Sequence, residues 1–242
     1  MTIAYQPRPG ATFAYAIHVS SSTTTALDNR PVAHQPKTTA DFTANHRVLD
    51  AQNGTTRVEV RLARGGIGER TFVMRFDRAA QLTAVESVEG IPAEALGSLG
   101  LSELFPAAAG APPNRPLRPG DRWTISDHVQ LAGMDAPALL TGAGRLVELG
   151  VIDGHDVATV TSSTALPLTS TTTTSEGLQT LTGTQTTTIT VVYDVRDGSV
   201  RHSSATTTGH FAVTLRPPQG QAGAPITGTL DVELTSEIRR IG

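Results

Sequence analysis

Pro9-Gly10-Ala11-Thr12-Phe13 and Pro119-Gly120-Asp121-Arg122-Trp123 are two versions of one pattern. In each, a Pro-Gly turn is followed by a large aromatic residue that begins an alternation of apolar and polar side chains. That alternation has the period of a half-buried β-strand. The chain therefore starts the same kind of strand twice, about half a chain length apart.

More segments correspond in the same order. In the first half, Arg47-Val48-Leu49 precedes an Asn53-Gly54 turn, and in the second half Arg145-Leu146-Val147 precedes an Asp153-Gly154 turn. Further on, Phe76-Asp77 precedes Leu82 in the first half, and Tyr193-Asp194 precedes Val200 in the second. Self-similarity in a fixed order is typical of a duplicated supersecondary unit. We expect residues 1–242 to form a single β-rich domain with two similar halves, about 9–106 and 119–242, joined by a Pro/Ala-rich linker over 107–118.

Strand signals dominate both halves. Asn-Gly and Asp-Gly pairs favour tight hairpins, because both central positions of a type I′ turn need positive φ. Consecutive strands joined by short turns imply an antiparallel meander. The predicted fold is mainly β, a curved sheet or half-barrel of about 10–11 antiparallel strands. Phe13 and Trp123 are expected in the core, one for each half.

One helix is expected over residues 92–105. Pro92 suits a helix start, Pro106 ends the helix, and leucines recur at helical spacings between them. Residues 166–186 are of low complexity, with four consecutive threonines at 171–174. Their composition leaves two alternatives open, a flexible loop or edge-strand material.

Composition narrows the class of protein. Hydrophobic residues make up 38% of the chain and charged residues 17%, with a net charge of -3 and no cysteine. Neither a basic stripe nor interleaved aromatic residues point to nucleic acid. No stretch resembles a signal peptide or a transmembrane segment. Roughly 15% threonine favours strands with one wet face. The lysine-poor, cysteine-free composition favours a secreted or cell-envelope domain whose leader is removed, with a cytoplasmic location as the alternative.

The sequence supplies no recognisable catalytic or cofactor site. The seven histidines form no H-x-H or H-x-x-x-H pair, so a metal site is not expected. A nucleophile elbow, a phosphate-binding glycine motif and a paired-carboxylate signature are not found either. We therefore expect a protein that is not an enzyme and carries no cofactor.

The repeated Pro-Gly-x-x-aromatic opening, the paired hairpins and the aromatic-Asp-turn-aliphatic signature resemble bacterial envelope proteins with the half-barrel fold of LolA-like carriers and mycobacterial lipid-binding lipoproteins. The resemblance covers about residues 9–88 and 119–215. It implies a lipid or acyl chain held on the concave face of a curved sheet under helices. This chain departs from the family in having one short expected helix and no lipobox cysteine.

Two functions remain in view. The first is a non-catalytic exported binding module that carries a lipid or another hydrophobic ligand. Its ligand would lie between apolar rows from equivalent strands and the apolar stripe of the helix, namely Phe72, Met74, Phe76, Ile189, Val191 and Tyr193 with Leu96, Leu101, Leu104 and Phe105. The alternative is a structural or protein-interaction domain of the envelope without a small-molecule ligand.

Overall fold

A single antiparallel sheet contains every regular element that the structure describes. The computed structural model describes residues 1–28, 32–65, 67–78, 80, 82–92, 112–129, 136–174, 177–218 and 223–242. The strands are β1 (Thr12–Leu27), β2 (Ala33–Gln52), β3 (Thr55–Arg64), β4 (Ile67–Phe76), β5 (Leu82–Val88), β6 (Ile91–Pro92), β7 (Arg122–Val129), β8 (Ala138–Ile152), β9 (His155–Thr174), β10 (Gly177–Asp194), β11 (Val200–Arg216) and β12 (Ile226–Arg240). The prediction of a curved antiparallel sheet is confirmed, with twelve strands where about 10–11 were expected.

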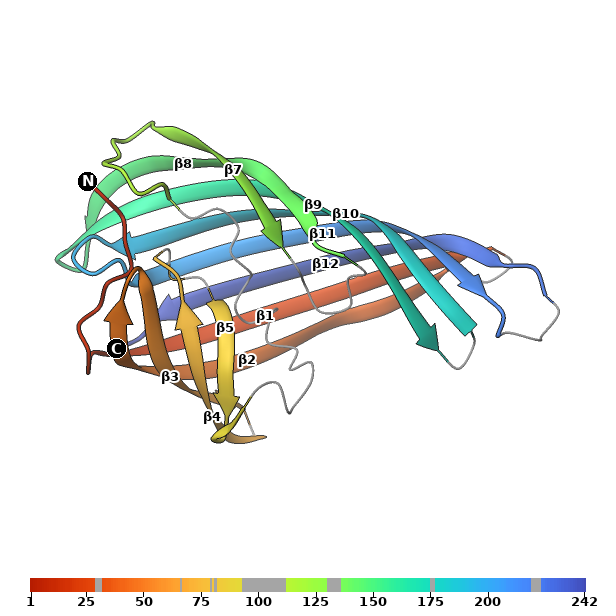
Figure 1. Ribbon diagram of the computed structural model, residues 1–242, viewed down its shortest axis with the longest axis horizontal. Coiled ribbons are helices and arrows are strands. Elements are labelled where there is room, and N and C mark those ends of the chain that lie inside the picture. Colours follow the sequence, from red (N-terminus) through yellow and green to blue (C-terminus); the bar gives the residue numbers. More distant parts are fainter. Residues whose placement is uncertain are drawn as a thin grey trace.

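The strand order shows two meanders placed side by side. It runs β6-β5-β4-β3-β2-β1-β12-β11-β10-β9-β8-β7, so the first strand of the chain pairs with the last. β7 and β6 are the outermost strands. Figure 1 shows the sheet curling into a half-barrel at one end, with β3, β4 and β5 on one side and β7 and β8 on the other. We call this part the body.

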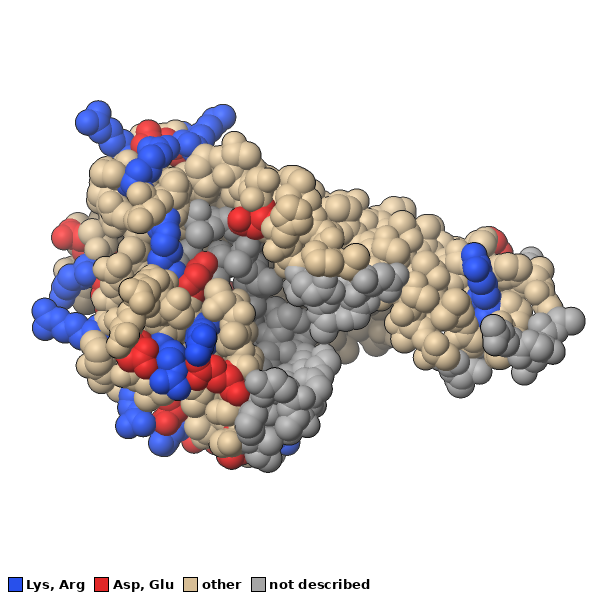
Figure 2. Space-filling model, in the orientation of Figure 1, with Lys and Arg blue, Asp and Glu red and all other residues tan. Residues whose placement is uncertain are grey.

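Six strands continue beyond the body as an arm. The arm consists of residues 20–27, 33–41, 166–174, 177–185, 209–216 and 226–234, which extend past the paired lengths of β3 and β8 (Figure 1). On the face shown in Figure 2, charged side chains gather on the body, while most of the arm is uncharged. The arm is rich in threonine, and β-branched residues such as threonine favour a pleated β-surface. This preference explains why uncharged segments of the chain can form long paired strands here.

The low-complexity stretch belongs to this arm. Its described residues, 166–174 and 177–186, lie in β9 and β10 and pair with each other. The β10 part also pairs with β11, whereas β8 pairs with β9 only up to Ala165. Edge-strand material is therefore correct for residues 166–174, which form one edge of the arm, and a flexible loop is wrong for the described residues. Threonine on alternate positions lets a strand of low hydrophobicity keep a wet outer face and still pair with a neighbouring strand.

Matching hydrogen bonds occur at the openings of the two halves. The N–H of Gly10 donates to the carbonyl of Val48 (2.8 Å), and the N–H of Gly120 donates to that of Leu146 (2.7 Å). Each acceptor begins a bulge, between Val48 and Asp50 in one half and between Leu146 and Glu148 in the other. The register therefore assigns corresponding positions in the two halves one by one.

The hairpins after these bulges share a turn but differ in length. Asn53-Gly54 and Asp153-Gly154 both have positive φ at the two central residues, as a type I′ turn requires. From bulge to turn, the second hairpin has two more residues on each strand, Val151-Ile152 and His155-Asp156. The predicted hairpins are confirmed, and the second one projects further.

The two opening aromatic residues are not buried alike. Phe13 is 4% exposed within the core of the first half. Trp123 is half-buried, and its indole lies against Gly144, the residue opposite it on β8. A β-carbon at Gly144 would fall 2.3 Å from the ring. The expectation of full burial is thus correct for Phe13 and wrong for Trp123, because the ring at the last strand of the sheet covers a glycine and has no further strand beside it.

The segment between the halves is described only in part. The expected helix lies beyond the described residues except for Pro92, which ends β6. In the described part of the expected linker, Leu117 is 1% exposed and exchanges two backbone hydrogen bonds with Met1. These bonds hold the N-terminus against the start of the second half. Across the part of the chain that the structure covers, no helix is long and apolar enough to span a membrane.

Candidate ligand pocket on the concave face

The predicted apolar rows occupy corresponding places in the two halves. Phe72, Met74 and Phe76 pair with alternate residues of β3, and Ile189, Val191 and Tyr193 pair with alternate residues of β9. Counting from the bulges, Phe76 corresponds to Tyr193, because their partners Thr56 and Ala158 stand at equivalent positions. All six side chains are buried, between 0% and 9% exposed.

Four of these six residues line a pocket on the inner side of the sheet. The pocket is bounded by residues from β1, β2, β4, β5, β10, β11 and β12, from the β4–β5 turn and from the N-terminal segment. Its lining consists of Tyr5, Tyr15, Ile17, His46, Phe76, Ala80, Leu82, Ile189, Val191, Tyr193, Val200, Ser203 and Ile238. Its free volume is about 80 Å³. Both halves thus contribute side chains to one predominantly apolar space.

The other predicted residues lie elsewhere. Phe72 and Met74 are buried in the core of the first half, 5% and 0% exposed, and do not bound the pocket. Leu96, Leu101, Leu104 and Phe105 belong to the part of the chain that the structure does not describe. The rows predicted from sequence therefore meet at the pocket through Phe76, Ile189, Val191 and Tyr193.

Three tyrosines, His46 and Ser203 are the residues of the lining with polar side chains. The rings of Tyr15 and His46 are tilted by 58° with their centroids 4.8 Å apart, and the ring centroids of His46 and Phe76 are 5.8 Å apart. Burial lowers the pKa of His46 to about 3, so its imidazole is neutral at physiological pH. Burial also raises the pKa values of Tyr5, Tyr15 and Tyr193. Every group in the lining is therefore uncharged near neutrality.

Sequence reasoning missed three of these aromatic residues. His46 was not assigned to a site, yet it shares the inner face with Ala44 and Val48, both apolar and at alternate positions. That alternation was the available signal. Tyr15 stood in a predicted strand without being linked to a site. Tyr5 precedes β1, where no periodicity marks it, and it reaches the pocket because its N–H bonds the carbonyl of Arg78 (2.6 Å).

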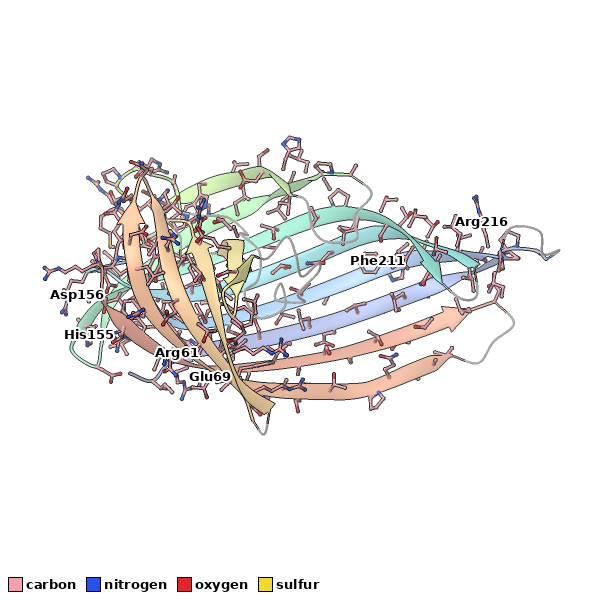
Figure 3. The ribbon with its side chains drawn as sticks, turned by 60° about the horizontal axis from the view of Figure 1, so that its bottom comes forward. Arg61, Glu69, His155, Asp156, Phe211 and Arg216 are labelled. Carbon is pink, nitrogen blue, oxygen red and sulfur yellow. The ribbon has the colours of Figure 1, made fainter. Side chains whose placement is uncertain are left out.

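The apolar inner face continues from the pocket into the arm. On β12, Ile238 is followed on the same face by Leu234, Val232 and Leu230, and Leu230 pairs with Phe211 of β11. The Phe211 ring lies against Gly183 and Gly209, where a β-carbon would fall 2.8 and 2.4 Å from it. Figure 3 places Phe211 within the arm. These glycines let the ring lie along the sheet.

The most buried carboxylate of the described chain stands beside the pocket. Asp194 accepts a hydrogen bond from the N–H of Arg196 (3.0 Å), contacts Arg201 (3.5 Å) and lies 3.1 Å from Nδ1 of His155. These contacts fix the β10–β11 turn. The described residues contain no group of three or more His, Asp or Glu side chains suited to a metal ion. The chain matches no protein-family model, and no curated protein shows significant similarity to it.

Proposed function

We propose that this protein is a non-catalytic binding module that holds a hydrophobic ligand on the concave face of its sheet. The observation that carries the proposal is the apolar pocket built jointly by the two halves, with only neutral polar groups in its lining. An uncharged, apolar lining selects for a hydrophobe over a sugar or a nucleotide, because charged or hydroxyl-rich ligands would lose hydration without compensation.

The volume limits what the pocket itself can hold. At about 80 Å³ it is well below the roughly 300–1,000 Å³ of pockets for drug-sized ligands. It suits a short apolar group such as the end of an alkyl chain. The inner face of β12, with Leu234, Val232 and Leu230, would support the rest of the chain. We therefore propose a lipid or fatty acyl ligand that ends in the pocket and extends along the arm.

We also propose that the chain arose by duplication and acts outside the cytoplasm. The matching turns, bulges and register of the two halves support the duplication. Composition supports export. The resemblance to half-barrel lipid carriers is consistent with both proposals and with the ligand class.

Binding of a fluorescent fatty acid tests this function, with native mass spectrometry to detect lipid that co-purifies. Val200→Phe places a larger side chain at the pocket lining and should weaken binding at least several-fold. Leu178→Phe, at a 37% exposed position of the arm, is the matched control and should bind like the unmodified protein. Melting curves establish that both variants fold.

Failure of the unmodified protein to bind any alkyl ligand would contradict the proposal. The alternative, an interaction domain without a small-molecule ligand, would then be favoured. Equal binding by Val200→Phe and the unmodified protein would show that the ligand lies outside this pocket.

A further inference from the structure

Two arginines face each other across the β7–β8 pair without a counter-charge. Arg122 stands directly opposite Arg145, and both are exposed. Like charges at directly opposed positions destabilise a sheet. Among the described residues, no carboxylate lies within ion-pair distance of either guanidinium. The nearest acid in sequence, Asp121, is held by the N–H of Arg118 (3.0 Å) and by Arg115 (3.3 Å).

The first half shows how the same position is neutralised. Arg47, the counterpart of Arg145, is opposite Thr12 and donates to Glu59 of β3 at 3.1 Å. In the second half, Thr161 stands where the first half has Glu59, and Arg122 stands where it has Thr12. The second half therefore lacks the acidic residue that neutralises the arginine in the first half, and it has an additional basic residue, Arg122. Such an uncompensated pair is suited to bind an anion, because guanidinium groups match the geometry of phosphate oxygens.

Exposed apolar side chains lie further along β8, towards the turn of the β8–β9 hairpin. Val147, Leu149, Val151 and Ile152 are 37%, 46%, 67% and 45% exposed. These four are half of the eight large hydrophobic residues that are exposed in the described chain. They lie on the hairpin that is two residues longer on each strand than its counterpart. In Figure 3, His155 and Asp156, which follow its turn, lie at the end of the molecule opposite Arg216 of the arm.

We propose that this hairpin end and the Arg122–Arg145 pair dock the protein on a bilayer that contains anionic phospholipid. The guanidinium groups would bind lipid phosphates, and Val151 and Ile152 would enter the headgroup region. A soluble anion would need the arginines but not the apolar hairpin, whereas a membrane interface rewards both. The docking surface is separate from the concave pocket, so this proposal does not depend on the proposed ligand.

Acidic residues limit the expected affinity. Glu148, Asp153 and Asp156 lie on the same hairpin, and only Asp153, at 4.0 Å from Arg201, is close to a base among the described residues. Binding should therefore be modest, reversible and weakened by salt, since the attraction acts within a Debye length. It should require the arginines and the apolar side chains together.

Co-sedimentation with vesicles tests the proposal. Vesicles of phosphatidylcholine mixed with phosphatidylglycerol should retain the protein, and vesicles of phosphatidylcholine alone should retain much less. The double variant Arg122→Gln/Arg145→Gln should weaken binding to the anionic vesicles roughly tenfold or more. Thr161→Glu, which supplies the acid found at Glu59 in the first half, should weaken it about fivefold. Val151→Ser/Ile152→Ser should also lower the bound fraction.

Matched variants separate these effects from general charge and hydrophobicity. Arg47→Gln/Arg61→Gln removes the same charge from the first half, and Val32→Ser/Leu178→Ser removes two other exposed apolar residues. Both should bind like the unmodified protein, and melting curves show whether each variant folds. Equal retention on the two kinds of vesicle, or unchanged binding by Thr161→Glu, would overturn the proposal. Complete displacement by inorganic phosphate at constant ionic strength would overturn it too and assign the site to a free anion.

Discussion

Two glycines separate the effect of backbone strain from that of steric conflict. Gly54 (φ 75°) and Gly198 (φ 68°) both lie in the left-handed region. Nothing lies within 4 Å of a β-carbon built at Gly54, whereas one at Gly198 would fall 2.0 Å from the carbonyl oxygen of Ala4. Gly54→Ala should cost about 1–2 kcal/mol through strain alone. Gly198→Ala should cost clearly more, because the N-terminal segment must also move.

Urea denaturation of both variants measures this difference. Equal losses of stability would mean that the N-terminal segment yields without cost. The control is Gly65→Ala, at a loop glycine with negative φ and open space around it, which should leave stability within the usual scatter of surface substitutions.

His46 should make stability depend on pH in the acidic range. Its folded-state pKa is lowered to about 3, while the unfolded value is near 6.5. Between these values the unfolded chain binds a proton that the folded chain does not. Stability from this group is therefore complete above about pH 6.5 and falls as the pH drops, by up to ~1.4 kcal/mol per pH unit.

Replacing His46 with phenylalanine should flatten this part of the profile. The substitution keeps an aromatic ring beside Tyr15 and removes the titrating group. The measurement is the free energy of unfolding from pH 4 to pH 8 for both proteins. Parallel profiles would show that other groups account for the acid sensitivity. His18, exposed on the outer face beside Asp41, gives the control variant His18→Phe.

At the scale of the element, β8 accommodates the only tryptophan by means of a glycine. The indole of Trp123 occupies the space above Gly144, so Gly144→Ala should displace the ring and destabilise the protein by about 1–3 kcal/mol, as overpacking does. Tryptophan fluorescence reports the change directly. We expect red-shifted emission in the variant. An unchanged spectrum would show that the ring already lies away from β8, and Gly150→Ala, where only Val157 is near, is the control.

Local signals predicted the elements unevenly. Asn53-Gly54 and Asp153-Gly154 located their hairpins because a type I′ turn depends on the two residues themselves. The structure of 166–186 could not be decided from sequence, because threonine-rich strands lack the apolar alternation that marks half-buried strands; the stretch lies in β9 and β10, with 166–174 at an edge of the arm. His46 was not connected with the site, since a histidine on an apolar face departs from the usual pattern.

At the scale of the whole molecule, the β1–β12 pair joins the two meanders. Tyr15 to Leu27 pair with Arg240 to Gly228 along this seam. Removing residues 226–242 should leave β1 and β11 with long unpaired edges, which are templates for association. We expect the truncated chain to aggregate or form oligomers in size-exclusion chromatography. Removal of residues 241–242 alone should have a small effect, and a soluble monomer after the larger truncation would contradict the importance of the seam.

Sequence could not predict this seam or the pocket that spans it. Alternation identifies the inner face of each strand, and short turns order neighbouring strands within a half. Neither signal specifies which strand of one half meets the other half. The pocket requires Tyr15 and Ile17 of β1 to face Val191 and Tyr193 of β10 across β12 and β11, an arrangement that only the assembled sheet provides.

The position of the seam also determines how the molecule responds to force. The start of β1 and the end of β12 lie at the same end of the sheet, since Tyr15 pairs with Arg240 and Ile241 bonds to Ala14. Tension applied between the two termini would therefore load these hydrogen bonds one pair at a time. Such unzipping needs far less force than sliding two strands past each other, where many bonds break together. A machine that pulls on the N-terminus would first release Met1 from Leu117 and then peel β1 from both neighbours. A sheet with extensive pairing can in this way be stable at equilibrium and still yield readily to a pulling motor.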